Sequence, residues 1–404
     1  MTPRRLLSLV LLGLALAGTV WGAAKGVAAW RFDKGLARAK ANAASGRLDD
    51  VRRWLATLPP SRHENPEVAD LRGVCEHEAG HYQAALNAWS LVPPDSPRAV
   101  PVALARARTL ITDLGRYDEA ETVLRDALRV RGPFALEVRH TLSQLYFLES
   151  RTYEMRRVIR DGWREWTNPP VELRDLWLLD GGVREIDAVR SPVSQAARLA
   201  PDDDRVWLAQ AGVALLEGRL DEAARKLDSC LKRRPDDPAV WRAKLRLGRL
   251  SLDSPGVETA LTHLSGDRLT DADRLDALAW LASRRKDDAE ERRLLERRVA
   301  LGPVDLVPYE RLIILASRAG ETEQVEALRR RKAELTEVRE RYRLLLADAP
   351  PAGGFSELAT LAETLKRPFE AYGWWNLSAR LHPGDPDSLS GMSRLRKFRD
   401  APAD

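Results

Sequence analysis

The sequence predicts an all-helical solenoid built from stacked helix-turn-helix units. Beyond residue 31, apolar residues recur at helical spacing, and glycine or polar residues interrupt the pattern about every dozen positions. Prolines recur with a 34-residue period: Pro201 and Pro235 are one period apart, Pro303 lies two periods further on, and Pro133 lies two periods before Pro201. No stretch has the strict alternation of a strand. Such a period is typical of repeat proteins, whose units pack on their neighbours.

The composition fits a folded repeat array. Of the 404 residues, 44% are apolar and 31% are charged, so the chain can bury helix faces and keep a solvated exterior. The net charge is +5, but basic and acidic residues are interleaved along the chain instead of gathered in one basic tract. We therefore expect no nucleic-acid partner. The only cysteines, Cys75 and Cys230, exclude a disulfide framework.

Residues 1–31 are predicted to tether the chain to a membrane. Arg4 and Arg5 precede an uncharged run, residues 6–24, which would span about 28 Å as a helix, close to the hydrocarbon thickness of a bilayer. A cleaved signal peptide is the alternative, because residues 15–17 and 22–24 offer small side chains at cleavage-type spacing. The length of the run favours a retained single-pass signal-anchor.

Two features of the sequence bear on the orientation of this anchor. Basic residues lie on both sides of the apolar run, and their number alone favours a cytoplasmic body. Signal-anchors with so short a leading tail commonly export the part of the chain that lies beyond the apolar run. We therefore expect a protein of the bacterial inner membrane whose solenoid is extracytoplasmic.

The segment between Pro201 and Pro235 gives the clearest repeat unit. Trp207 is expected to cap the contact between the paired helices, and Gly218 to allow the turn between them. Ala223 must be small because the first helix crosses close to it. In other units, the equivalent repeat positions are occupied by Trp241, Ala371, Trp375 and Pro383. This joint pattern of tryptophan, small, glycine-turn, alanine and proline positions resembles the tetratricopeptide repeat (TPR).

The resemblance implies a right-handed α-solenoid with a concave groove for peptides or helices, a protein-binding function and no cofactor. About ten units are predicted over residues 32–384, with the weakest at about 170–201, followed by a capping half-unit and disordered tail over residues 385–404. The register slips by one residue twice and by about twelve once, where the helix from about Glu323 to Leu346 runs long. The chain also resembles the TPR region that precedes an FG-GAP-type propeller in some bacterial proteins, but no propeller is expected in these 404 residues.

One motif points to an enzyme. His77-Glu78-Ala79-Gly80-His81 matches the H-E-x-x-H pattern of zinc peptidases, in which two imidazoles one helical turn apart bind the metal beside a general-base glutamate. That chemistry needs an uninterrupted helix, whereas the repeat register places Gly80 in a turn. We therefore predict no metal site and no enzyme activity, with a zinc-dependent hydrolase as the alternative.

The candidate partner-binding residues are arginines on the first helices of the units. Arg242, Arg246 and Arg249 recur at i, i+4 and i+7 and are expected to form one cationic stripe facing the groove, with Arg284 and Arg318 at comparable positions in the next two units. Guanidinium groups bind carboxylates in bidentate fashion, so the stripe predicts an acidic partner. The alternative is a solvated helix face.

A tryptophan pair adds a second candidate contact. Trp375 takes the core position of the late unit, so its neighbour Trp374 is expected to be partly exposed and available to a partner. The leading functional hypothesis is a membrane-anchored scaffold for protein-protein interactions, in bacterial envelope assembly. A structural subunit of a larger complex, with no groove ligand, is the remaining alternative.

Overall fold

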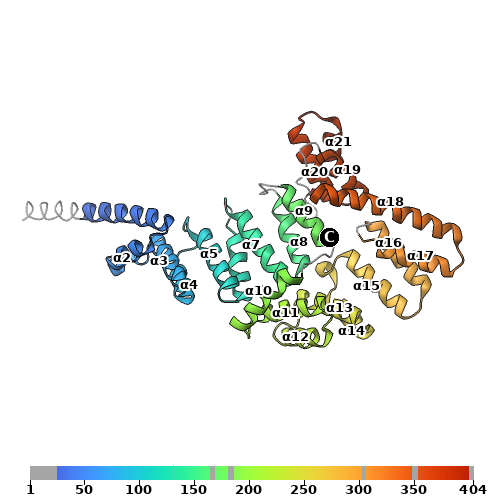
Figure 1. The fold of residues 1–404 in the computed structure, drawn as a ribbon, viewed down its shortest axis with the longest axis horizontal. Coiled ribbons are helices and arrows are strands. Elements are labelled where there is room, and N and C mark those ends of the chain that lie inside the picture. Colours follow the sequence, from blue (N-terminus) through green and yellow to red (C-terminus); the bar gives the residue numbers. More distant parts are fainter. Residues whose placement is uncertain are drawn as a thin grey trace, which may run out of the picture. The chain divides into compact units, whose positions relative to one another are not determined.

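The chain is helical throughout the part that its structure describes. A computed structural model describes residues 25–130, 132–163, 169–180, 186–302, 305–347 and 354–399 (Figure 1), and every regular element in these ranges is a helix. The helices form two compact units, the first ending at Thr109 and the second beginning at Leu110. The predicted all-helical fold is confirmed.

The predicted membrane-spanning run lies before the first described residue. Residues 6–24 lie outside the described residues, as does Pro303 of the proline series. Among the helices of the described ranges, none combines the length and the apolar character needed to cross a bilayer.

The first unit contains the earliest helices of the array. Residues 25–44 are helical and are followed by α2 (Leu48–Ala56), η1 (Pro60–Arg62), α3 (Pro66–Glu78), α4 (Tyr82–Trp89) and α5 (Ala99–Thr112), which continues into the second unit. The Asn65 side chain accepts hydrogen bonds from the first backbone N–H groups of α3 and so fixes where this helix begins. A Cβ atom at Gly73 would lie 2.2 Å from Nε1 of Trp89, so α3 must carry glycine where α4 crosses it.

The second unit continues the pairing of consecutive helices. Its helices are α6 (Tyr117–Leu128), α7 (Ala135–Leu148), α8 (Thr152–Asp161), α9 (Pro169–Asp180), α10 (Ile186–Leu199), α11 (Asp204–Leu216), α12 (Leu220–Arg233), α13 (Pro238–Leu250), α14 (Ser254–His263), η3 (Gly266–Arg268), α15 (Asp271–Arg284), α16 (Asp288–Leu301), α17 (Val307–Arg318), α18 (Thr322–Ala347), α19 (Phe355–Thr364), α20 (Pro368–Leu381) and α21 (Pro386–Arg399). From α11 to α20, each odd-numbered helix packs against the next helix in the chain.

A left-handed backbone conformation marks the turn inside those helix pairs whose turn lies within the described residues. Gly266 and Gly384 have positive φ between pairs, whereas within the pairs the turn residues with positive φ are Gly46, Gly80, Gly115, Ser150, Gly218, Leu252, Lys286, Gly320 and Lys366. From Gly218 to Gly320 they are spaced by 34 residues, and the two steps from Gly80 to Ser150 are 35 each. The step from Gly320 to Lys366 is 46 residues because α18 is 26 residues long. The predicted register, including its slips and its long helix, is confirmed.

Side-chain contacts repeat with the same period. The indole N–H of Trp207 donates to the carbonyl of Pro201 at 2.6 Å, and that of Trp241 donates to the carbonyl of Pro235 at 2.7 Å. Each tryptophan thereby ties its helix to the turn that ends the preceding unit. Ala223, which the sequence predicts to be small, is fully buried in the core between α11 and α13.

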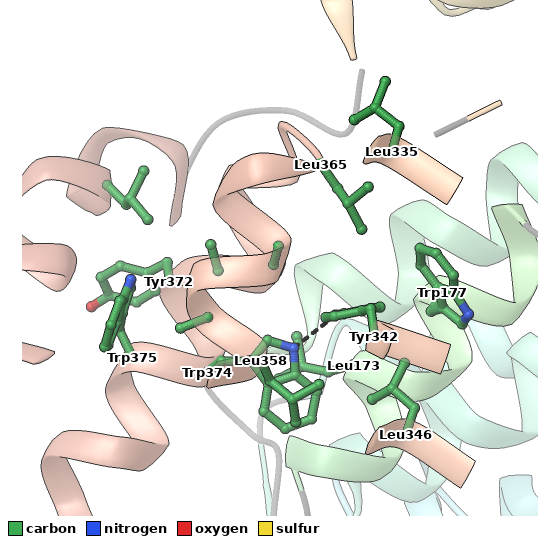
Figure 2. Packing of buried hydrophobic residues seen from close by; sticks show 14 of the residues in the cluster. Leu173, Trp177, Leu335, Tyr342, Leu346, Leu358, Leu365, Tyr372, Trp374 and Trp375 are labelled. Atoms are coloured by element: carbon green, nitrogen blue, oxygen red, sulfur yellow. Dashed lines mark hydrogen bonds between the residues drawn. The ribbon is translucent and has the colours of Figure 1, made fainter. Parts of the chain in front are cut away.

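In the weakest predicted unit, about residues 170–201, the two helices pack against different parts of the chain. Helix α9 packs against α8 and α20, whereas α10 packs against α7 and α11. The apolar face of α9 is buried against helices from the end of the array, so Leu173 and Trp177 belong to one core with Tyr342 of α18 and Trp374 of α20 (Figure 2). The repeat signature is weak here because α9 serves this distant contact.

Polar and aromatic contacts fix the junction between α9 and the late helices. The Trp177 and Tyr342 rings lie 4.8 Å apart in an edge-to-face arrangement, and the Arg367 guanidinium lies over the Trp177 ring at 4.9 Å. Arg367 is buried, and it also donates to the carbonyl of Leu176 at 3.4 Å. The second unit is therefore closed by contacts between segments almost 200 positions apart in the sequence.

We predict that Leu173→Ala loosens helices α19 and α20 although it lies far from them in the sequence. Leu173 is fully buried in the shared core, so the cavity should cost about 2–5 kcal/mol of unfolding free energy. Hydrogen exchange should show earlier exchange of α20 amides. The control is Leu227→Ala, which opens a cavity in the local cluster of α11 to α13. Equal protection of the α20 amides in both variants would contradict the inference that α9 holds α20 in place.

Candidate functional site

The histidines of the H-E-x-x-H motif lie on opposite sides of a turn. Helix α3 ends at Glu78, Gly80 has a φ of +77°, and His81 immediately precedes α4. His81 Nδ1 lies 3.0 Å from a carboxylate oxygen of Glu76, while the His77 ring packs against two aromatic rings. The two imidazoles therefore do not share the uninterrupted helix that the zinc-peptidase chemistry needs. In the part of the chain that the structure describes, no cluster of three ligand-type side chains could hold a metal ion.

The three arginines of the predicted stripe have different surroundings. Arg242 is largely buried and forms an ion pair with Glu154 of α8. It also donates to the carbonyl of Arg268 at 2.6 Å, and its guanidinium lies over the Tyr153 ring at 4.4 Å. Arg242 is thus a tie between α13, α8 and η3, and it is not the solvated group that a uniform stripe requires.

The remaining stripe residues are exposed. Arg246 has no carboxylate partner among the described residues, and the protein around it lowers its pKa by removing part of its hydration. Arg249 interacts electrostatically with Asp276. Arg284 is exposed at the end of α15, and Arg318 is exposed at the end of α17 with its nearest carboxylate at 3.7 Å.

The prediction that Trp374 is partly exposed is wrong. Its side chain is 0% exposed, and its indole N–H donates to the Tyr342 hydroxyl at 2.8 Å. Figure 2 shows this hydrogen bond between α20 and α18. Trp375 is in the core as predicted, and α18 packs against the side of α20 on which Trp374 lies. Trp374 is a core residue and offers no contact to a partner.

An arginine-rich cavity lies between the early and middle helices of the second unit. Its volume is about 540 Å³, and it opens between α6 and α8 on one side and α11, α13 and η3 on the other. We call it the arginine pocket, and its lining residues are Arg125, Arg151, Tyr153, Glu154, Arg157, Arg205, Arg234, Pro235, Asp236, Asp237, Pro238, Arg242, Asp267 and Arg268. Seven guanidinium groups face four carboxylates, which makes the lining cationic.

A buried ion network forms the floor of this pocket. Arg151 Nη1 contacts Glu121 at 2.6 Å and Glu149 at 2.8 Å, and Arg205 links Glu121 to Asp237 through contacts of 3.3 and 2.5 Å. All five groups have side chains that are less than a tenth exposed. Such a network holds its members in fixed positions because removing one partner leaves a buried charge uncompensated.

Glu121 is the central anion of the network. Burial alone would raise its pKa, but the guanidinium groups of Arg151, Arg205 and Arg125 outweigh burial and hold the pKa well below the ordinary value. The Tyr146 hydroxyl also donates to Glu121 at 3.1 Å. Glu121 is therefore ionised and keeps three arginines directed towards the pocket.

The pKa of Glu149 is shifted in the opposite direction from that of Glu121. Glu149 is fully buried, and burial raises its pKa above the ordinary value, although the guanidinium of Arg151 acts in the other direction. One of its oxygens has no hydrogen-bond partner among the described residues. Glu149 therefore adds less negative charge to the floor than Glu121 does, which leaves the pocket more cationic.

Two arginines at the rim are open to solvent. Arg157 and Arg268 are exposed, and neither is paired with a carboxylate within the ranges that the structure covers. Arg268 donates only to the carbonyl of His263, at 3.3 Å. These two guanidinium groups have donors available for a ligand, unlike the paired arginines of the floor.

Sequence reasoning missed this pocket because its members come from distant units. Glu121 meets Arg151 and Arg205, which lie 30 and 84 positions further on, and no local spacing indicates such a contact. One signal was present: Asp203 and Asp237 are 34 residues apart, and both cap a first helix by accepting from its backbone N–H groups. Because Asp237 also pairs with Arg205, this periodic cap marks one wall of the pocket.

The family comparison agrees with the repeat register. Residues 204–247, which include α11, α12 and most of α13, match the family model described as tetratricopeptide repeat. The segment is the one that the sequence predicts as the clearest unit. The chain is a helical repeat protein that contains a tetratricopeptide repeat, and it resembles the TPR class.

Solved structures that are similar to the chain include TPR proteins. The P58(IPK) TPR domain is 16% identical, with 91% of this chain and 97% of that chain covered and a TM-score of 0.28. Yeast Tom70 is 11% identical, with 89% and 87% covered and a TM-score of 0.29. A tetratricopeptide repeat protein from Parabacteroides merdae is 11% identical, with 74% and 99% covered and a TM-score of 0.29. No curated protein has a significant sequence match.

We predict that Glu149→Gln flattens the pH dependence of stability. Because the pKa of Glu149 is raised above 4.5, the folded state keeps a proton that the unfolded state releases as the pH rises past this value. Stability should therefore fall with rising pH, by at most about 1.4 kcal/mol per pH unit. Glutamine stays neutral and removes this slope in urea unfolding, whereas the exposed control Glu337→Gln keeps it. An unchanged slope in Glu149→Gln would contradict the assignment.

Proposed function

We propose that this chain is a binding scaffold, without catalytic activity, whose arginine pocket takes an acidic segment of a partner protein. The supporting observation is the lining of seven guanidinium groups against four carboxylates in a cavity of about 540 Å³. A cavity of this size accommodates a few side chains of a peptide. Carboxylate is the matching ligand chemistry because guanidinium donates to it in bidentate geometry.

The difference between the buried and the exposed arginines of the pocket supports this proposal. The buried floor arginines are held by Glu121 and its neighbours, so their field is preorganised before a ligand arrives. The rim arginines, Arg157 and Arg268, are exposed and make the direct contacts. Arg246, one helical turn beyond Arg242 on α13, extends the cationic surface along that helix.

The test is binding of a labelled octaglutamate peptide to the full chain in mild detergent, followed by fluorescence anisotropy. Reversing both rim charges, Arg157→Glu with Arg268→Glu, should weaken binding by about tenfold or more, because attraction becomes repulsion at the contact itself. Raising the salt concentration should weaken wild-type binding as well. The matched control is Arg330→Glu with Arg396→Glu, which changes the net charge equally at two exposed positions outside the pocket.

Two results would count against the pocket. If wild type does not bind octaglutamate above an octaglutamine reference, the proposal of an acidic ligand fails. If the rim and control variants lose equal affinity, only the overall charge of the protein attracts the peptide. Equal melting temperatures of the variants ensure that the comparison concerns binding.

We also propose that residues 6–24 tether this scaffold to the bacterial inner membrane, with the solenoid extracytoplasmic and a role in envelope assembly. The support is the uncharged run itself, which is long enough to cross a bilayer as a helix. The full chain should fractionate with membranes, and a variant lacking residues 6–24 should not. If the protein expressed from the full-length gene is recovered in the soluble fraction without its first 24 residues, this segment is a cleaved signal peptide and not an anchor.

A further inference from the structure

One carboxylate of the arginine pocket occupies the position expected for a ligand. Glu154, in the first turn of α8, lies between the guanidinium groups of Arg242 and Arg151. Its Oε1 accepts from Arg242 and lies 3.7 Å from Arg151 Nη2. Its Oε2 is buried and has no hydrogen-bond partner among the described residues. This carboxylate therefore satisfies only half of its hydrogen-bonding capacity where it lies.

The arginine that Glu154 contacts is held in place by other groups. Arg242 donates to the carbonyl of Arg268 at 2.6 Å and lies over the Tyr153 ring, and neither contact involves the Glu154 side chain. If Glu154 moved away, the Arg242 guanidinium would keep its position and present free donors to the cavity. The site beneath Glu154 is thus preformed for a second carboxylate.

The other lining carboxylates do not share this arrangement. Asp237 is fixed twice, because it caps α13 and pairs with Arg205. Asp236 and Asp267 are exposed, and the Asp267 carbonyl accepts a hydrogen bond from Tyr153. Glu154 is the lining acid that combines a central position between two arginines with an unsatisfied buried oxygen.

We propose that Glu154 is an internal competitor for the partner's carboxylate and thereby sets the selectivity of the pocket. This inference rests on the proposed function. A partner carboxylate takes the place of Glu154 against Arg242, and Glu154 turns towards the open cavity. At Arg242, a single acidic group gains little, since it exchanges one carboxylate for another. A segment with several acidic groups also reaches Arg157 and Arg268, so the pocket selects clustered acids over isolated ones.

The experiment compares peptides with one and with four glutamates in a glycine-serine background, bound to the full chain in detergent. In wild type, the four-glutamate peptide should bind much more tightly than the one-glutamate peptide. Glu154→Gln should raise affinity for the one-glutamate peptide by about tenfold and narrow the difference between the two peptides, because the competing charge is gone. The matched control is Asp267→Asn, which makes the same charge change at an exposed position of the lining.

A second variant separates competition from long-range charge. Glu154→Asp keeps the charge but shortens the side chain by one methylene, so it withdraws from Arg242. If competition sets the selectivity, Glu154→Asp should behave like Glu154→Gln. If it behaves like wild type, or if Asp267→Asn narrows the selectivity as much as Glu154→Gln does, the inference is overturned.

The outcomes also distinguish this inference from the proposed function. Should wild type bind the four-glutamate peptide while Glu154→Gln leaves the ratio between the two peptides unchanged, only the competitor role fails. Should neither wild type nor Glu154→Gln bind either peptide, the acidic-ligand function itself fails. If Glu154→Gln binds the one-glutamate peptide and wild type does not, both the competitor role and the acidic-ligand function are supported. Circular dichroism and equal melting temperatures exclude loss of folding as the cause.

Discussion

The buried guanidinium of Arg151 is the group around which the early helices of the second unit and the arginine pocket are arranged. It contacts Glu149, Glu121 and Glu154, which come from its own turn, from α6 and from α8. Its removal would leave three acids crowded together with little water to solvate them, a change that typically costs several kcal/mol. Through Glu121 the same group also positions Arg205, so α11 is held against α6. The floor of the arginine pocket exists because this one cation is buried.

Arg151 has a counterpart at the other distant contact of the second unit. It follows Ser150, a turn residue with positive φ, just as the buried Arg367 follows Lys366. At the turn that contains Gly218, by contrast, the following residue, Arg219, is exposed. The residue after the turn is therefore exposed at Arg219, whereas Arg151 and Arg367 are buried and join segments far apart in the sequence.

The features that the sequence predicts well are local, and those that it misses are not. The 34-residue turns and the long α18 follow from backbone and helix rules that act within one unit. Because Trp374 and Trp375 are consecutive, they lie about 100° apart around α20, and this spacing does not indicate that α18 covers Trp374. Likewise, the i, i+4 spacing places Arg242 and Arg246 on one face. It gives no information about Glu154, 88 positions earlier in the chain, which pairs with Arg242 and not with Arg246.

The pocket separates the charges that stabilise the fold from the charges that are free to bind. The floor pairs are buried, so dissolved salt screens them weakly and they hold the same geometry over a wide range of ionic strength. The rim guanidinium groups are exposed, and their attraction for an anion declines as salt rises. Affinity can therefore respond to ionic conditions while the folded site persists. Glu154 lies between these two sets: it is largely buried and pairs with Arg242, yet one of its oxygens is unsatisfied. A carboxylate in that intermediate position is the one that an arriving anion can displace without disturbing Glu121 and Arg205 beneath it.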